Sequence, residues 1–298
     1  MAKRQKARPD GKQFAELMAA GMTQKQIAEK YGVSKGTVAG AVRHWKQSNK
    51  DAQKFNVVNI GKPLRLVGDY MVVGDIHVPT TLYDFFRLMI QVAKKYDIRK
   101  IISAGDFYNM DFVSKYQFAV QPITWAQERE AGRVLINELT DAFDEVILLM
   151  GNHDRRMQKF TNGAFEDSDI FGLLSTNEKI ITSNFGYCFV QSGGQDWMIT
   201  HGSNYSVNQL SVADQLAQKN RMNIISHHEH HLAKGWDRYK HHVIINNGGL
   251  FDASQMAYTQ LDSNKMPNMA NGFTMLRNGC GHVFSNDARF TDWSVLLD

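Results

Sequence analysis

The sequence predicts an α/β domain that follows a small helical module. From about residue 66 onward, short apolar runs alternate with amphipathic stretches of helical length, and polar residues repeatedly follow the apolar runs. Short apolar runs of this kind are typical of buried strands. The chain has 298 residues, of which 43% are hydrophobic, so it can form one large domain and one small module. We therefore expect 66–298 to be the α/β domain.

The predicted elements of this domain alternate in its first half and are mostly strands in its second half. Strand-helix-strand units of this length favour a sheet whose functional loops follow the carboxyl ends of the strands. The expected helices lie at 82–96, 123–140, 169–174 and 207–219. The expected strands lie at 70–74, 99–104, 145–150, 187–191, 196–200, 223–226, 242–246, 273–277 and 282–285. The segment 155–178 is otherwise rich in loops.

Residues 10–48 carry the signals of three short helices. Thr23 and Gln26 have the spacing of a capping box at the start of the second helix, and Gly32 suits its end. Ser34 can cap the third helix. A helix, a tight glycine turn and a second helix together form a helix-turn-helix.

Positive charge is concentrated in this part of the chain. Residues 1–50 contain 11 of the 34 Lys and Arg residues but only 3 of the 30 acidic residues, so the remainder is weakly acidic. The asymmetry indicates a polyanion partner, and a solvated basic tail is the simpler alternative. We expect 1–9 to be a basic arm and 49–65 to be a linker.

The stretch from Met22 to Val38 resembles the helix-turn-helix of homeodomain-like and resolvase-type DNA-binding domains. The resemblance implies a recognition helix over Ser34–Gln47 and a nucleic-acid partner, with DNA expected. The side chains expected to reach phosphates are Lys25, Lys35, Arg43 and Lys46. Those expected to reach base edges are Ser34, Thr37 and Lys35. A helical hairpin for protein contacts is the alternative, and the excess positive charge favours nucleic acid.

Five predicted strands of the α/β domain end in side chains that can bind metal ions. These side chains are Asp75, His77, Asp106, Asn152, His201, His228 and His230. Each one alone has an ordinary interpretation as a turn residue or a rim residue. Five consecutive coincidences of this kind are hard to sustain, so we interpret the series as one site.

The strand ends carry motifs in a fixed order. The motifs are Gly74-Asp75-Ile76-His77, Gly105-Asp106-Phe107-Tyr108-Asn109, Gly151-Asn152-His153-Asp154, His201-Gly202 and His228-Glu229-His230. This series resembles the calcineurin-like metallophosphoesterases over about 66–290. The resemblance implies an α/β fold in which two mixed β-sheets form a sandwich flanked by helices. It also implies a two-metal site at the carboxyl ends of the strands.

The resemblance implies a role for each of these side chains. One metal ion would be bound by Asp75, His77 and His230. The other would be bound by Asn152, His201 and His228. Asp106 would bridge the two ions, and His153 would be the catalytic imidazole beside the leaving group. The resemblance favours Mn²⁺, while oxygen and imidazole ligands without thiolate also suit Fe²⁺, Zn²⁺ or Ni²⁺.

The chemistry of such a site follows from its two charges. Two cations about 3.5–4 Å apart can share and acidify a water, which gives a bridging hydroxide for in-line attack on phosphorus. They also neutralise the charge that develops on the non-bridging oxygens. The reaction class implied by the residues is therefore phosphate-ester hydrolysis.

The surroundings of the catalytic imidazole depart from the family pattern. Asn109 stands where phosphomonoesterases of the protein-phosphatase type carry an Asp that pairs with this imidazole, and an amide cannot raise its pKa by charge. Asp111 or Asp154 is the alternative partner of His153. The Asp-Arg-Gly sequence of protein serine/threonine phosphatases is absent. We expect a catalytic group of His153, Asp154 and Asn109 that differs from the protein phosphatases.

Other side chains beside the motifs have two interpretations each. Arg155 and Arg156 can clamp a phosphate, since a guanidinium binds phosphate bidentately. A salt bridge to the acids of 165–169 is the alternative. His227 stands where the family has Gly, so His227 and His231 are alternative metal ligands.

The expected function is a dinuclear metal-dependent phosphoesterase, most simply a phosphodiesterase or nuclease acting on DNA that the basic module delivers. The first alternative is a phosphomonoesterase for a nucleotide, small molecule or phosphoprotein, with the module used for targeting. The second is a DNA-binding regulator without catalysis. Without a stretch of membrane length or a secretory signal, and with only Cys188 and Cys280, the chain is expected in the cytoplasm.

Overall fold

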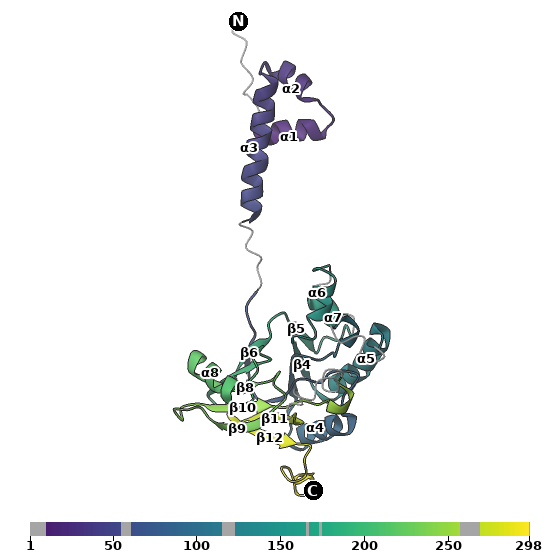
Figure 1. Ribbon diagram of the computed structural model, residues 1–298, viewed down its shortest axis with the longest axis vertical. Coiled ribbons are helices and arrows are strands. Elements are labelled where there is room, and N and C mark those ends of the chain that lie inside the picture. The colour runs from purple at the N-terminus through teal and green to yellow at the C-terminus, as the bar shows by residue number, and fades with distance from the viewer. Residues whose placement is uncertain are drawn as a thin grey trace. The chain divides into compact units, whose positions relative to one another are not determined.

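The computed structural model describes residues 10–54, 61–114, 123–164, 167–172, 175–256 and 269–297. The chain forms two compact units, Met1–Gly61 and Lys62–Asp298 (Figure 1). The strands of the described residues all belong to the second unit. Among the helices in these residues, none has both the length and the apolar character required to span a membrane.

The first unit contains the three helices that the sequence predicts, and each begins near its predicted position. They are α1 (Gly11–Ala19), α2 (Gln24–Tyr31) and α3 (Lys35–Lys54). The Thr23 hydroxyl accepts the N–H of Gln26, and the Gln26 side chain accepts the N–H of Thr23, so the predicted capping box is confirmed. Gly32 ends α2 in the left-handed conformation, with a φ of 64°, which Gly adopts at little cost.

The helices of this unit close around a small apolar core. Phe14, Ile27 and Val38 are fully buried, one from each helix. Helix α3 continues to Lys54, beyond the expected end at Gln47 and into the segment expected to be a linker. No Gly or Pro occurs between these two positions, so nothing in the local sequence stops the helix.

The second unit contains two six-stranded sheets. The first sheet has, in spatial order, the strands β1 (Arg65–Val67), β6 (Tyr187–Ser192), β7 (Gln195–Thr200), β8 (Asn223–Ser226), β10 (Val243–Asn247) and β9 (Leu232–Trp236). The second sheet has the strands β12 (Cys280–Ser285), β11 (Gly272–Arg277), β2 (Tyr70–Val73), β3 (Lys100–Ala104), β4 (Glu145–Leu149) and β5 (Ile180–Ser183).

Both sheets are mixed, as the sequence predicts. In the second sheet β2, β3, β4 and β5 are parallel, and β11 is antiparallel to β2 and β12. In the first sheet β7, β8 and β10 are parallel, and β6 and β9 run antiparallel to their partners β7 and β10. The carboxyl ends of the parallel strands therefore lie along one edge of each sheet.

The alternation of side chains along the strands builds two layers of core. Tyr70 and Val72 of β2 pack between the sheets, where they join Trp197 of the first sheet. Met71 and Val73 point to the opposite face and pack beneath helices. Because successive side chains of a strand point to opposite faces, a strand buried on both faces is apolar at every position.

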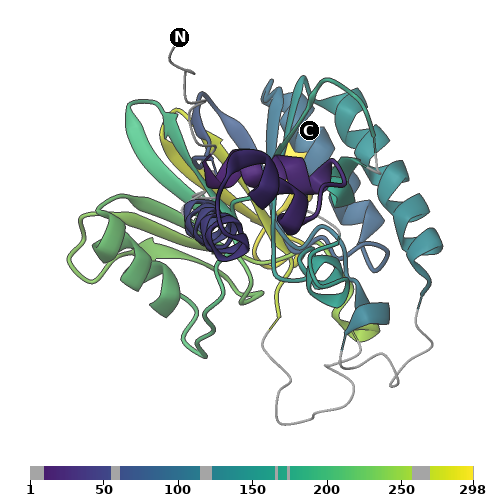
Figure 2. The same cartoon turned by 90° about the horizontal axis from the view of Figure 1, so that it is seen from above.

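Helices flank both sheets (Figures 1 and 2). Helices α4 (Tyr83–Lys95) and α5 (Trp125–Ala142) pack on the outer face of the second sheet, and α8 (Ser211–Asn220) packs on the first. The shorter helices are η1 (Asp111–Val113), α6 (Arg156–Phe160), α7 (Asp167–Gly172), η2 (Ala253–Gln255) and α10 (Trp293–Leu297). This arrangement is the predicted sandwich of two mixed sheets flanked by helices.

The strands absent from the prediction lie at sheet edges. β1, β5 and β9 are edge strands, and all but one of their positions are exposed or only partly buried. An edge strand of three to five residues needs no continuous apolar run, so it gives a weak signal in the sequence. Helix α6 likewise lies in a segment that was expected to be rich in loops.

Candidate metal centre

Each sequence motif follows a strand whose carboxyl end faces the same region of the second unit. Asp75 follows β2 and Asp106 follows β3, which are parallel neighbours. His201 follows β7 and His228 follows β8, which are parallel neighbours in the other sheet. The two sheets thus deliver ligand-type side chains to one place from opposite sides.

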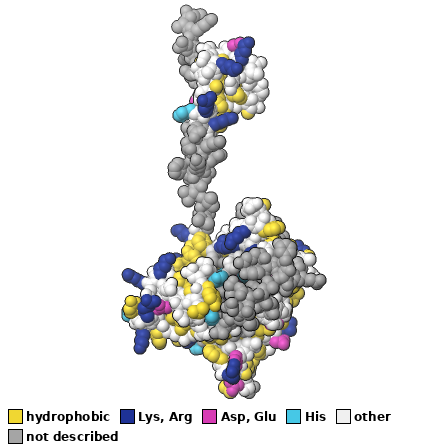
Figure 3. Space-filling view, in the orientation of Figure 1, with side chains coloured by type: hydrophobic (Ala, Val, Ile, Leu, Met, Phe, Trp, Pro, Cys, Tyr) yellow, Lys and Arg dark blue, Asp and Glu magenta, His cyan; other side chains and the backbone are white. Residues whose placement is uncertain are grey.

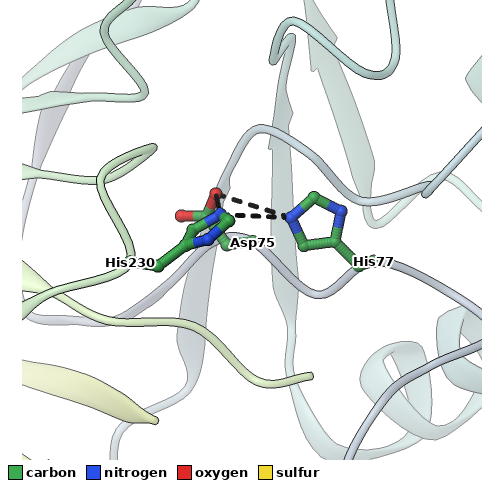
Figure 4. A group of neighbouring side chains, drawn as sticks. All are labelled: Asp75, His77 and His230. Carbon is green, nitrogen blue, oxygen red and sulfur yellow. Dashed lines mark hydrogen bonds and ion pairs between the residues drawn. The ribbon is translucent and has the colours of Figure 1, made fainter. Parts of the chain in front are cut away.

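The first group of neighbouring side chains consists of Asp75, His77 and His230 (Figure 4). The Nε2 atom of His230 lies 3.0 Å from Oδ1 of Asp75 and 3.4 Å from Nε2 of His77. All three residues are buried. Two imidazoles and a carboxylate therefore direct ligand atoms toward one point.

Asp106 links this group to a second one. Its Oδ2 lies 4.0 Å from Nε2 of His77 and 3.2 Å from Nε2 of His201. Asp106, His201 and His228 form the second group, in which the ligand atoms lie within 4.8 Å of one another. The side-chain oxygen of Asn152 lies 3.0 Å from Nε2 of His201. All seven predicted ligand residues are thus brought together.

The hydrogen bonds of His201 indicate that a cation fits this place. Its Nδ1 donates to the carbonyl of Ala104 at 3.0 Å, so in the neutral ring Nε2 carries a lone pair. That lone pair faces the oxygens of Asp106 and Asn152. Nε2 of His201 and the oxygens of Asp106 and Asn152 repel one another, so the arrangement is favourable only with a proton or a cation between them. The oxygen and imidazole ligands suit a divalent cation, and the carbonyl fixes the tautomer that binds it.

The charges of these side chains agree with this interpretation. Burial opposes ionisation of Asp106, but the nearby His201 and His153 hold the pKa of its carboxyl well below the ordinary value. Burial likewise opposes the charged form of His201, and the Asp106 carboxylate still raises its pKa to about 9. The buried carboxylate therefore attracts positive charge strongly.

The backbone at the candidate ligands adopts an uncommon conformation. Five of these seven residues have positive φ: Asp75 (49°), His77 (49°), Asp106 (50°), His228 (78°) and His230 (58°). Residues other than Gly adopt this left-handed region rarely, and such strain tends to cluster at functional sites. The sheets therefore hold the ligands in a geometry that the local sequence would not choose.

Two glycines allow the loops of the centre to approach each other. A Cβ atom on Gly105, whose φ is 89°, would lie 2.7 Å from the backbone N of Gly151. A Cβ atom on Gly151 would lie 2.1 Å from Oδ1 of Asp106. Gly105 and Gly151 are thus required by close packing around Asp106.

We expect Gly151→Ala to lower the free energy of unfolding by about 1–3 kcal/mol, because the added methyl group overpacks the loop. The same change should displace Asp106 and lower the bound metal content. Urea unfolding and metal analysis measure the two effects. Gly172→Ala is the control, since its Cβ would have no neighbour within 4 Å. Unchanged stability and metal content in Gly151→Ala would contradict the packing role.

The predicted catalytic imidazole is held on both of its nitrogens. Nδ1 of His153 donates to the backbone carbonyl of Asn109 at 2.7 Å. Nε2 accepts from the guanidinium of Arg156 at 2.8 Å and lies 3.8 Å from Oδ2 of Asp106. Arg156 is anchored in turn by Oδ1 of Asp111 at 3.1 Å and by the Asn109 carbonyl at 2.8 Å. A fixed guanidinium therefore stands beside the candidate ligands.

The other predicted catalytic and phosphate-binding residues have different contacts. Asp154 accepts the backbone N–H groups of Gly151 at 2.8 Å and Tyr108 at 3.1 Å, so its carboxylate joins two loops of the centre. Burial, aided by the Asp106 carboxylate, raises the pKa of Asp154 to about 7. The Asn109 side chain donates to Asp111 at 2.8 Å and reaches His153 only indirectly. The guanidinium of Arg155 donates to the carbonyl of Asn184 instead.

The two histidines considered as alternative ligands contact other groups. His227 accepts from the Asn247 side chain at 2.9 Å through Nε2, and its ring packs against Gly74. Burial lowers the pKa of His227 to about 4, so this imidazole is neutral. His231 donates through Nε2 to the carbonyl of Ser206 at 3.1 Å. Strand alternation does not explain this division, because His228 and His230 have positive φ and the run lies between β8 and β9.

Behind the loop that carries Asn109, Glu128 of α5 is a buried carboxyl group. It accepts the N–H of Met110 at 2.6 Å. Burial raises its pKa from 4.5 to about 8. A raised pKa means that the protonated form stabilises the fold: this contribution is complete below the unfolded value and is lost as the pH rises through about 8.

Glu128→Gln should remove this pH dependence. We expect the variant and the wild-type protein to have similar free energies of unfolding at about pH 5. At about pH 9 the variant should be more stable, by at most about 5 kcal/mol. Urea unfolding at both pH values measures the difference. A stability difference that does not change with pH would contradict the raised pKa.

The residues predicted to contact DNA all belong to the first unit. Lys25 lies on α2, and Lys35, Arg43 and Lys46 lie on α3, all exposed. Lys and Arg side chains are visible on the surface of this unit (Figure 3). Ser34 caps α3 by accepting the N–H of Thr37 at 3.0 Å, so both hydroxyls lie at the start of the predicted recognition helix.

The fold and the convergent ligands together define a metal-dependent phosphoesterase. The chain belongs to the calcineurin-like phosphoesterases, whose family profile matches residues 69–267. Residues 4–53 match the homeodomain-like domain, which is a helix-turn-helix. The resemblance on which the sequence prediction depends is thereby confirmed for both parts of the chain.

Solved structures that match the chain have low sequence identity to it. A conserved predicted phosphoesterase from Streptococcus pneumoniae has 12% identity and a TM-score of 0.33, with 73% of this chain and 97% of that chain covered. Vacuolar protein sorting 29 from Cryptosporidium parvum has 15% identity and a TM-score of 0.37, with 74% of this chain and 98% of that chain covered. The Zn²⁺ complex of Vps29 from Entamoeba histolytica has 12% identity and a TM-score of 0.36, with 72% of this chain and 97% of that chain covered. No curated protein matches the chain in sequence.

Proposed function

We propose that the protein is a dinuclear phosphodiesterase that hydrolyses DNA. The observation that carries this proposal is the position of Asp106, which is grouped with His201 and His228 on one side and lies 4.0 Å from Nε2 of His77, with which it is also grouped, on the other. One carboxylate between two sets of imidazoles suits two cations that share it. Mn²⁺ is the proposed metal, with Asp75, His77 and His230 at one ion and Asn152, His201 and His228 at the other.

The side chains of the centre would orient the substrate. When bound, the two cations supply Lewis-acid activation of a water and neutralise charge on the phosphate oxygens. Arg156 can add a guanidinium contact to the same oxygens, since its Nη1 is occupied by Asn109 and Asp111 while Nη2 reaches the His153 side of the site. His153 would hold that guanidinium in place and face the leaving group.

The helix-turn-helix unit would supply the substrate. Its exposed Lys and Arg side chains can neutralise phosphates and raise the local concentration of DNA. Base contacts from the start of α3 would add sequence preference. The two units would then combine capture of DNA with hydrolysis at the metal centre.

The test measures metal content and hydrolysis by the full-length protein in Mn²⁺. We expect two metal ions for each chain, turnover of a chromogenic diester, and cleavage of DNA. The double variant Lys35→Ala/Arg43→Ala should cleave the small diester normally and DNA more slowly, with a weaker dependence on salt. Lys95→Ala, an exposed lysine on α4, is the matched control. A single bound metal, or intact DNA with normal diester turnover, would contradict the proposal.

One observation favours a phosphomonoesterase as the second candidate. A monoester carries more negative charge than a diester, and Arg156 places a cationic guanidinium 2.8 Å from Nε2 of His153. Paired mono- and diester substrates with the same leaving group separate the two candidates. Faster turnover of the monoester would assign the helix-turn-helix unit to targeting.

A further inference from the structure

Two residues of the run after β8 hold a neighbouring loop. His228 and His230 belong to the ligand groups, whereas the residues that alternate with them contact Ser206. The carboxylate of Glu229 accepts the N–H of Ser206 at 3.0 Å, and Nε2 of His231 donates to its carbonyl at 3.1 Å. Both backbone groups of this loop residue are therefore tied to the segment that carries the candidate ligands.

Glu229 and His231, which together form a clamp on Ser206, are held by further contacts. The second oxygen of Glu229 accepts from the Asn246 side chain at 2.8 Å, and Asn246 also donates to the carbonyl of Gln209 at 2.9 Å. Glu229 is 1% exposed. A buried carboxylate with several hydrogen bonds is a costly way to hold a surface loop, so the position of this loop matters to the site.

The residue that this clamp positions is Tyr205. It directly precedes Ser206 and follows His201 by four positions. Its ring centre lies 5.9 Å from that of His231, with an angle of 37° between the planes. The residue is nevertheless 55% exposed. An aromatic ring is thus held against His231, the neighbour of the candidate ligand His230 in the sequence, with much of its surface open to solvent.

We propose that Tyr205 stacks on the nucleobase of the substrate beside the scissile phosphate. Every base has an aromatic face, so such a platform binds nucleotides with little sequence preference. This suits a phosphodiesterase whose sequence preference would come from a separate unit. The inference rests on the proposed function and adds recognition of the nucleoside to it.

Two chromogenic diesters test the proposal with the metal-loaded protein. One is the p-nitrophenyl ester of thymidine monophosphate, and the other is methyl p-nitrophenyl phosphate. Both release the same leaving group, and only the first carries a base. We expect Tyr205→Ala to raise KM about 10-fold for the thymidine ester and to leave the methyl ester unchanged. Tyr205→Phe, which keeps the ring, should behave like the wild-type protein.

The chain offers a matched control in Tyr239. This residue is 63% exposed, and its ring centre lies 6.3 Å from that of His241 with an angle of 32°. It lies beyond β9, at the opposite end of that strand from His231. Tyr239→Ala should therefore change KM for neither ester.

The outcomes distinguish this inference from the proposed function. An equal change for both esters in Tyr205→Ala, or no change for either, would overturn the stacking role while the diesterase activity stands. The same rise in KM for the thymidine ester in Tyr205→Phe as in Tyr205→Ala would assign the contact to the hydroxyl and also overturn stacking. Wild-type protein that cleaves neither ester would overturn the proposed function and this inference with it.

Discussion

Replacing Asp106 with asparagine is expected to reduce phosphate-ester hydrolysis by at least about 1000-fold. Its Oδ2 lies within 4.0 Å of three imidazoles, those of His77, His153 and His201. An amide has almost the same shape but no charge, so two cations at this place would lose the anion between them. The largest loss should therefore appear in metal content and in kcat together.

Asparagine is a suitable replacement because the fold should tolerate it. Asp106 has a φ of 50°, and Asn adopts this region more readily than most residues. Asp97→Asn is the matched control, since Asp97 has a φ of 53° and is exposed away from the ligands. Steady-state kinetics and metal analysis check the result. An Asp106→Asn protein that keeps two metal ions and most of its activity would contradict the bridging role.

The proximity of the ligands can be predicted from the sequence because each one follows a strand. Asp75, Asp106 and Asn152 end three apolar runs, and parallel neighbouring strands bring such ends together. The register of the second sheet, in which Ile101 pairs with Met71 and Val146, places the three loops side by side. Assignment of roles to these residues as ligands stays a prediction until metal is measured.

The surroundings of the ligands are less accessible to sequence reasoning. The positive φ values of Asp75 and His77 arise from tertiary packing, and the residues themselves give no local sign of them. The clamp of Glu229 on Ser206 joins positions 23 residues apart. The contacts of Asp154 are equally hard to predict, because a carboxylate beside a catalytic motif can take part in catalysis or accept a backbone N–H, as Asp154 does from Gly151. Long-range hydrogen bonds of this kind leave no periodic pattern.

Loss of the Arg156 guanidinium is the second large effect that we expect. Arg156→Ala should lower kcat/KM by about 100- to 1000-fold, the range found when one preorganised donor to a developing charge is removed. The donors of Arg156 that bind Asn109 and Asp111 fix the direction of the group before substrate arrives. A fixed donor loses little entropy on contact with phosphate. The loss should be larger for a monoester, which carries more negative charge.

Chemical rescue separates this role from a structural one. Added guanidinium ions should restore part of the activity of Arg156→Ala, because they can occupy the space beside His153. The same ions should not restore Asp106→Asn, which lacks a carboxylate. Asp111→Asn weakens the ion pair that anchors Arg156 but keeps the guanidinium, so we expect a smaller loss of activity than in Arg156→Ala, mainly in kcat. Full activity of Arg156→Ala, or a loss that guanidinium cannot relieve, would show that this arginine only supports the fold around His153.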